Sequence, residues 1–189
     1  DICIANQALN FIAALDGREM DFDGKMAASG SLITELYDEL EASAYFKQLA
    51  PKSLGREFFE NQQKPLLTIK QYQPADLAHT FVQHIVSRIS LELNSLQAKR
   101  VLITGGGALN EYLVKQLRQT SEAEIIVPDE KLVNYKEALV FAFLGVLKIR
   151  GEVNVLASVT GAESDSCSGK IWHPASGKDY TKAGKNQLC

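Results

Sequence analysis

The sequence predicts an α/β fold that is rich in helices and holds a short, mainly parallel sheet. In the N-terminal half, apolar side chains recur every three or four positions, which is the spacing of amphipathic helices. After Arg100 two short apolar runs, residues 101–104 and 124–127, alternate with helical patterns. This alternation of strand and helix favours a parallel sheet.

The elements of the N-terminal half are almost all helical. Periodicity predicts helices at residues 5–15, from the turn at 21–24 to about 40, at 44–49 and at 53–61, and the connector 66–73 could hold a short strand. Gly17 stands where a glycine typically ends a helix. The longest helix begins at Pro74, and its apolar stripe is formed by Leu77, Phe81, Val82, Ile85, Val86 and Ile89.

The C-terminal half carries the strands. Residues 101–104 read as a buried parallel strand, followed by a helix at 111–119 and a second strand at 124–127. Residues 135–149 form a very apolar helix, which we expect to be buried on most sides. We therefore expect one folded lobe over residues 1–173 and a loose tail at 174–189, which ends a stretch after Gly161 where Ser, Gly, Lys and Asp are frequent.

Composition excludes several classes of protein. The chain has 189 residues, of which 46% are hydrophobic and 23% charged, with a net charge of −3, so a basic nucleic-acid-binding face is not expected. There is no apolar run of membrane-spanning length and no signal-peptide pattern, which favours a cytoplasmic protein without membrane contact. The three cysteines are far apart and odd in number, so we expect free thiols and no metal site.

The strongest local signal for function is a run of three glycines, Gly105, Gly106 and Gly107, between the first strand and a helix. Glycines here let the backbone approach a ligand closely, and the following helix offers free N–H groups, so the pattern favours a nucleotide-binding turn over a plain tight turn. A dinucleotide fingerprint would need a glycine where Asn110 stands, which makes a Rossmann oxidoreductase the weakest alternative.

Other candidate residues are weaker when each is taken alone. Asp1 and Asn6 stand where a strand end meets a helix, which is where active-site groups of α/β proteins gather. Glu137 lies near the expected start of the apolar helix, where an acid also stabilises the helix dipole. Arg56, in the block 52–57, suits a phosphate or a surface ion pair. His79, His84 and His173 form no metal or triad pattern.

Read in order, six segments resemble the anhydro-N-acetylmuramic acid kinases. They are DICIAN from Asp1, DFDGKMAASG from Asp21, PKSLGREFF from Pro51, VLITGGGALN from Val101, NYKEALVFAFLG from Asn134 and NVLASVTGA from Asn154. The resemblance runs over nearly the whole chain, and the order of all six segments is more specific than any one of them.

The resemblance implies a ribonuclease H-like lobe of the actin-like ATPase and sugar kinase superfamily. Family members have two lobes, hydrolyse the 1,6-anhydro bond of anhydro-N-acetylmuramic acid, and transfer the ATP γ-phosphate to O6 with Mg²⁺. This sequence would be the C-terminal lobe, because it opens without methionine at what reads as a strand end and lacks the phosphate-gripping GTSxDG-like motif of the N-terminal lobe. The partners implied are that lobe, the anhydro amino sugar and a second copy in a homodimer.

The resemblance also implies a role for each candidate residue. Asp1 would be the catalytic base, Asn6 and Glu137 would face the sugar, and Gly105, Gly106, Gly107 and Asn110 would form the adenosine-side turn. The family's DTGPGN is DICIAN here, PKSTGRE is PKSLGRE, and an acidic pair before Glu137 is replaced by Asn134 and Tyr135. Two alternatives remain: a kinase for another sugar, and a non-catalytic nucleotide- or sugar-sensing homologue.

Overall fold

The computed structural model describes residues 1–49, 51–69 and 71–172. The contacts divide the chain into two units, Asp1–Asn134 and a second that begins at Tyr135. None of the helices in these described ranges combines the length and hydrophobicity that a membrane crossing needs. The expected tail at residues 174–189, together with His173, lies outside the described residues.

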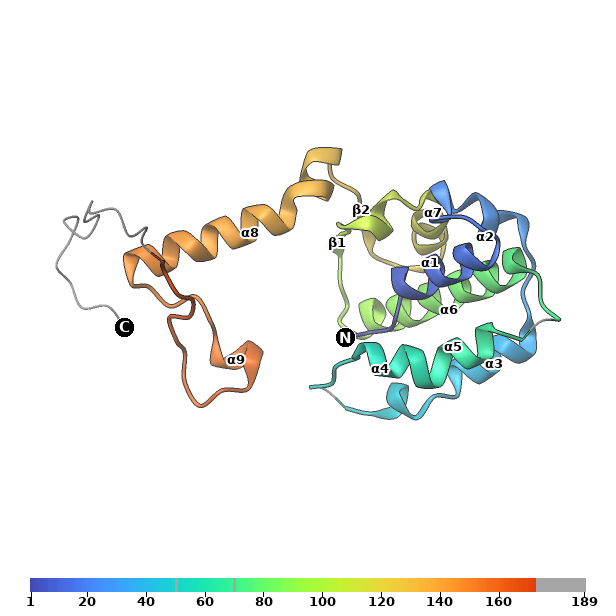
Figure 1. Ribbon diagram of the computed structural model, residues 1–189, viewed down its shortest axis with the longest axis horizontal. Coiled ribbons are helices and arrows are strands. Elements are labelled where there is room, and N and C mark those ends of the chain that lie inside the picture. The colour runs from blue at the N-terminus through green and yellow to red at the C-terminus, as the bar shows by residue number, and fades with distance from the viewer. Residues whose placement is uncertain (50, 70, 173–189) are drawn as a thin grey trace. The chain divides into compact units, whose positions relative to one another are not determined.

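The first unit is built around one long helix (Figure 1). The α-helices of this unit are α1 (Asn6–Leu15), α2 (Lys25–Ser29), α3 (Thr34–Glu41), α4 (Arg56–Phe58), α5 (Lys64–Leu67), α6 (Pro74–Ser95) and α7 (Glu111–Thr120), and α8 (Glu130–Arg150) begins in it. Short 3-10 turns lie at Phe22–Gly24, Ala44–Lys47 and Gly106–Leu109, and a π turn at Phe59–Gln63 joins α4 to α5. Helix α6 packs against α1, α2, α3 and α7.

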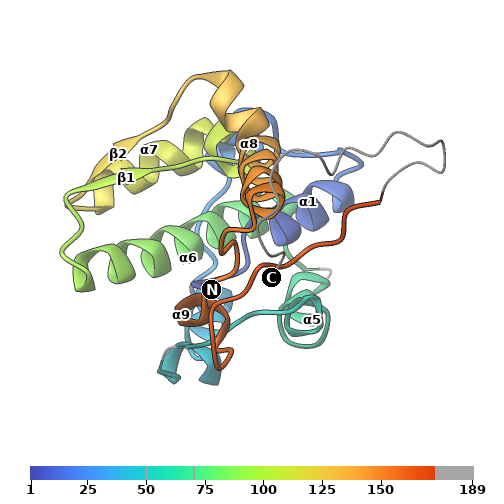
Figure 2. The same cartoon turned by 90° about the vertical axis from the view of Figure 1, so that its left-hand side faces the viewer.

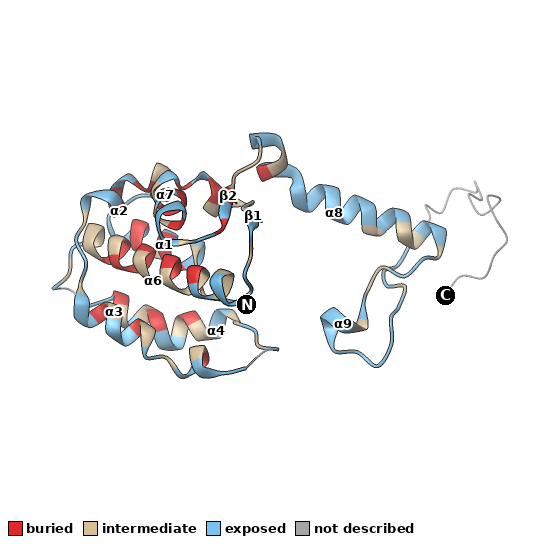
Figure 3. Cartoon of the chain, turned by 180° about the vertical axis from the view of Figure 1, so that it is seen from behind, coloured by how far each residue is buried: buried red, intermediate tan, exposed pale blue. Residues whose placement is uncertain are grey.

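The core follows the predicted apolar stripe of α6. Five of its six residues are buried, and Ile89 is half-buried against the same cluster. Figure 3 shows this buried stripe along α6, with further buried positions on α1 and α7. The prediction of a long helix that begins at Pro74 is therefore confirmed.

The sheet has two strands, β1 (Arg100–Leu102) and β2 (Glu124–Ile126), which pair in parallel with Val101 opposite Ile125. Helix α7 connects them, so the predicted strand–helix–strand unit is confirmed, and Figure 2 shows the two strands side by side. The expectation of a buried first strand is wrong at Leu102, which is 54% exposed, whereas Val101 and Ile103 pack against the core.

Two local predictions are corrected in the first half. The helical stretch expected from the turn to Leu40 is broken between α2 and α3. The linker between them is hydrogen-bonded to α6 instead: Asp76 accepts the Ser31 N–H at 2.7 Å, and the Thr80 hydroxyl accepts the Ile33 N–H at 2.9 Å. The described residues of connector 66–73 hold no strand, since α5 continues to Leu67.

The second unit continues α8 and adds α9 (Ala157–Thr160). Asn154 organises the return of the chain: its Nδ2 donates to the Leu144 and Ser168 carbonyls at 3.2 and 3.1 Å, and its Oδ1 accepts the Ser168 N–H at 2.7 Å. An isolated antiparallel bridge pairs Val155 with Ser166.

The expectation that residues 135–149 are buried on most sides is wrong for the described structure. Large apolar side chains of α8 are exposed, among them Tyr135, Leu139, Phe141, Phe143 and Ile149 (Figure 3). The apolar residues are spread around the whole helix instead of forming one stripe, so a single packed neighbour would leave many of them uncovered.

Candidate functional site

The three glycines form the turn between β1 and α7. Gly105 has φ +76° and ψ −177°, a backbone conformation open essentially to glycine alone. Gly106 begins the 3-10 turn, and a methyl group in place of its hydrogen would come 2.9 Å from Nδ2 of Asn6. The turn therefore needs glycine at position 105 for its dihedral angles, whereas a methyl group at position 106 would require the Asn6 carboxamide to shift.

Asn110 ends this turn and begins α7. Its Oδ1 accepts the Leu113 N–H at 2.9 Å, which satisfies one of the free N–H groups of the first helical turn. The residue is buried. The predicted site residues Asn6, Gly106 and Asn110 thus lie together, although none of the predictions assigned Asn110 to a helix cap.

These three residues line a cleft of about 860 Å³. The other lining residues are Leu9, Asn10, Met20, Asp21, Phe22, Asp23, Ala108, Leu109, Glu111, Val114, Lys115, Arg118 and Val127. Phe22 is 64% exposed and Leu109 49%, so the cleft offers apolar surface. Beside it lie the carboxamides of the lining asparagines and the cationic side chains of Lys115 and Arg118. A cleft with apolar walls and a few convergent polar groups suits a base with an attached polar sugar.

Asp1 lies against the block 52–57, to which the resemblance assigns no role. The Leu54 N–H donates to Oδ2 of Asp1 at 2.7 Å, and the Asp1 nitrogen donates to the Lys52 carbonyl at 2.8 Å. The Tyr45 hydroxyl donates to the Asp1 carbonyl at 2.6 Å. Among the described residues no donor contacts Oδ1, so that oxygen of an exposed carboxylate is available to accept a proton.

Tyr45 and the Leu54 amide were missed by the sequence analysis. A tyrosine and a main-chain N–H carry no pattern of their own, and both act on Asp1 across long stretches of chain. The only signal was that PKSLGREFF, which contains the 52–57 block, is one of the six segments of the resemblance. Arg56 of that block pairs with Glu60 at 3.6 Å, so the surface ion pair considered for it is observed.

Glu137 belongs to the second unit, whereas the other candidate residues belong to the first. It is exposed on α8. The expected helix start is corrected: α8 begins at Glu130, where Asp129 accepts the Leu132 N–H at 2.9 Å. Glu137 is therefore beyond the first turn, and the helix-dipole explanation for this acid is removed.

The sequence did not predict a buried ionic cluster between Glu41 of α3 and two side chains of α6, His84 and Arg88. His84 of α6 is fully buried, and its Nδ1 lies 2.5 Å from Oε1 of Glu41, whose other oxygen contacts Arg88. Burial alone would raise the pKa of Glu41, but the hydrogen bonds and charges of His84 and Arg88 outweigh it and hold that pKa below its ordinary value. Burial raises the pKa of the nearby Cys3 thiol to about 12.

The histidines form no metal site in the described part of the chain. Nδ1 of His79 lies 3.0 Å from the Ala27 carbonyl and 3.2 Å from the Tyr112 hydroxyl, while His84 belongs to the ionic cluster. No group of three His, Cys, Asp or Glu side chains among the residues described is arranged to bind a metal ion.

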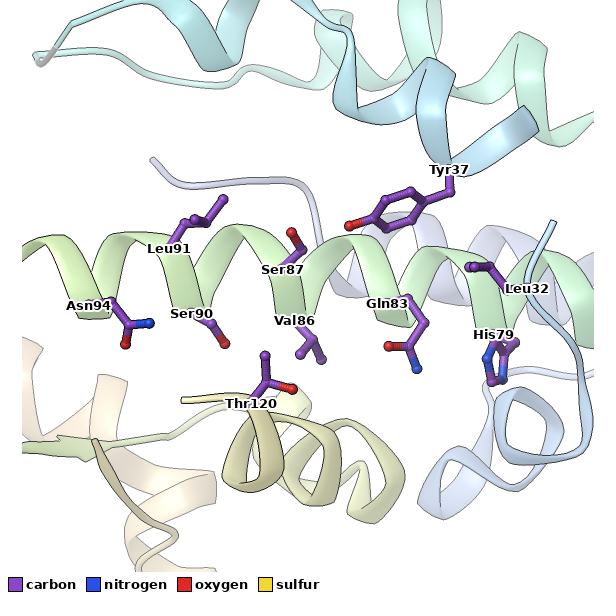
Figure 4. A pocket seen from close by; sticks show the side chains of 10 residues that line it. All are labelled: Leu32, Tyr37, His79, Gln83, Val86, Ser87, Ser90, Leu91, Asn94 and Thr120. Atoms are coloured by element: carbon purple, nitrogen blue, oxygen red, sulfur yellow. The ribbon is translucent and has the colours of Figure 1, made fainter. Parts of the chain in front are cut away.

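A second groove runs along α6 and has a volume of about 590 Å³. Figure 4 shows its lining side chains, which include Tyr37 from α3, Ser90 from α6 and Thr120 from α7. None of the predicted site residues lines it. The groove is thus separate from the glycine turn and from Asp1.

Comparison with known proteins extends the resemblance. The family model of anhydro-N-acetylmuramic acid kinase matches residues 5–174. A kinase of that name from Francisella tularensis subsp. novicida is 32% identical over 166 residues, which cover 83% of this chain and 44% of the relative. Namesakes from Hydrogenovibrio crunogenus and Actinobacillus pleuropneumoniae serotype 5b are 33% and 30% identical over 165 and 181 residues.

These two alignments cover 82% and 91% of this chain and 44% and 49% of the relatives, so the chain spans about half the length of the curated relatives it matches. The family match includes the glycine turn, the 52–57 block and Glu137, and it begins four residues after Asp1. The chain belongs to the anhydro-N-acetylmuramic acid kinase family.

Proposed function

We propose that this chain is the C-terminal lobe of a two-lobed sugar kinase with the actin-like ATPase fold. The complete protein would hydrolyse the 1,6-anhydro bond of anhydro-N-acetylmuramic acid and phosphorylate O6, giving N-acetylmuramic acid 6-phosphate for peptidoglycan recycling. The observation that carries the proposal is the exposed Asp1 carboxylate, held through Oδ2 by the Leu54 amide with Oδ1 free.

In this proposal Asp1 is the general base. Its free oxygen takes a proton from the water that attacks the anomeric carbon, and the bond from that carbon to O6 breaks. The released O6 then accepts the γ-phosphoryl group of ATP, and ADP leaves. A carboxylate within hydrogen-bond reach of the water is what such a step requires, and phosphoryl transfer otherwise depends mainly on positioning and charge neutralisation.

The cleft at the glycine turn would hold the adenosine side of ATP. Gly105, Gly106, Gly107 and Asn110 would form the adenosine-side turn, of which Gly106 and Asn110 line the cleft together with Asn6. Glu137 would contact the sugar. Mg²⁺ in proteins is often held by one or two carboxylates together with substrate phosphates, so we propose that it enters with ATP, without a dedicated cage in the described residues.

The test is mass spectrometry of the products formed by the complete protein with ATP, Mg²⁺ and anhydro-N-acetylmuramic acid, beside an Asp1→Asn variant. We expect a product that has gained one water and one phosphoryl group and that forms at only a small residual rate with the variant. An unchanged sugar, with ATP still bound, would refute this substrate and favour a kinase for another sugar or a sensor. The expected homodimer and cytoplasmic location stay predictions.

A further inference from the structure

Asp1 is fixed by more than its own side chain. The Tyr45 hydroxyl donates a 2.6 Å hydrogen bond to the main-chain carbonyl of Asp1. Tyr45 is 6% exposed while Asp1 is exposed, so the donor side of this bond is shielded from competing water. The bond restrains the main chain of Asp1, to which its carboxylate is attached.

Tyr45 is itself held on several sides. Its ring lies 5.5 Å from the Phe46 ring and 5.4 Å from the Phe58 ring, and the Lys52 ammonium lies 4.8 Å above it. Lys52 also donates to the Tyr45 carbonyl at 3.5 Å, while the Lys52 carbonyl accepts from the Asp1 nitrogen at 2.8 Å. The contacts therefore close a ring from Tyr45 to Asp1 to Lys52 and back.

The Tyr45 hydroxyl keeps its proton near neutral pH and therefore acts as a hydrogen-bond donor. Burial, with smaller contributions from Cys3 and Glu92, raises the pKa of Tyr45 above its ordinary value. The group stays protonated near neutral pH and has no basic role. It donates to the main chain of Asp1 while the Leu54 amide holds one carboxylate oxygen, so the two contacts constrain both ends of the residue.

We propose that Tyr45 is a positioning residue for the Asp1 base, aiming its free oxygen at the attacking water. The inference rests on the proposed role of Asp1. Loss of the hydroxyl would leave the ring in place and free the main chain of Asp1 to shift. Small misplacements of a reacting group lower the rate of the chemical step more than they lower substrate binding.

The test is Tyr45→Phe in the complete protein. We expect kcat to fall by about tenfold, with the KM values for sugar and ATP unchanged, because alignment and not binding is lost. Tyr37→Phe is the matched control, since it removes a hydroxyl from a tyrosine that lines the separate groove along α6 (Figure 4). This control should leave kcat unchanged.

A double variant with Asp1→Asn separates alignment from general stability. If Tyr45 acts through Asp1, Tyr45→Phe should not lower the residual rate of Asp1→Asn further. An equal loss in both backgrounds, or a rise in KM without a change in kcat, would overturn the inference. If Asp1→Asn abolishes turnover and Tyr45→Phe keeps the full kcat, only the role of Tyr45 fails. Full turnover by Asp1→Asn would overturn the proposed base and this inference together.

Discussion

The buried cluster of Glu41, His84 and Arg88 should be a main source of stability in the first unit, and Glu41→Gln tests this. The substitution keeps the shape of the side chain but removes the charge that faces both partners. Hydrogen bonds to charged groups each contribute about 1.5–3 kcal/mol, and leaving one partner of a buried ion pair without its counter-charge costs about 3–5 kcal/mol.

Three observations place the expected loss below the top of that range. The side chains of Glu41 and Arg88 are 19% and 17% exposed, so water partly replaces the lost partner. The Arg88 guanidinium also keeps its position 4.1 Å above the Phe46 ring, and glutamine still offers one acceptor. We expect a loss of about 2–3 kcal/mol, which lowers the Tm of a domain of this size by about 6–9 °C.

The assay is urea unfolding of the chain followed by far-UV circular dichroism, with Glu39→Gln as control because Glu39 is exposed on the same helix. The pH dependence gives an independent check. The folded pKa of Glu41 is below its ordinary value of 4.5, so its contribution is present above that pH and is lost as the pH falls through the folded pKa. A loss under 0.5 kcal/mol, or a difference between wild type and variant that persists in acid, would refute the reasoning.

Three further predictions concern the glycine turn and the buried thiol. Asn110→Ala should cost about 1 kcal/mol in urea unfolding because it removes the cap of α7, whereas Gln119→Ala at the other end of α7 should cost less. Gly106→Ala should weaken ATP binding by the complete protein, measured by calorimetry, and adding Asn6→Ala should restore room for the methyl group. Cys3 should alkylate more slowly in the folded chain than in urea, as peptide mapping would show, since its thiol keeps its proton to about pH 12 against 9.0 when free. Because the folded pKa of Cys3 lies above its unfolded pKa, the contribution of the protonated thiol to folding stability is full below pH 9.0 and declines above it.

The sequence predicted well the elements that depend on local periodicity. The apolar stripe of α6, the parallel strands joined by α7 and the glycine at position 17 all follow from spacing and backbone preference. Gly17 has φ +72°, as a helix-ending glycine should. These features are encoded within a few neighbouring residues.

Features that depend on distant contacts could not be read in the same way. The break after α2 is imposed by Asp76 and Thr80, which lie more than 40 residues away in the chain. The Glu41 cluster joins α3 to α6, and no spacing rule pairs a glutamate with a histidine 43 positions later. The exposure of α8 likewise depends on which surfaces face it, and helical periodicity carries no information on that.

The arrangement of the site gives the Asp1 segment a second role. Asp1 is held by Tyr45 and Leu54, and five residues later Asn6 lies against Gly106 of the glycine turn. An extended chain of five residues spans at most about 17 Å, so the proposed base and the proposed adenosine-side turn are tied by one short segment. A ligand that displaces the glycine turn would move Asn6, the first residue of α1. Residues 2–5 connect α1 to Asp1, so the displacement would reach the proposed base. Substitutions of Asn6 should therefore affect both nucleotide affinity and turnover, whereas those of Tyr45 should affect turnover alone.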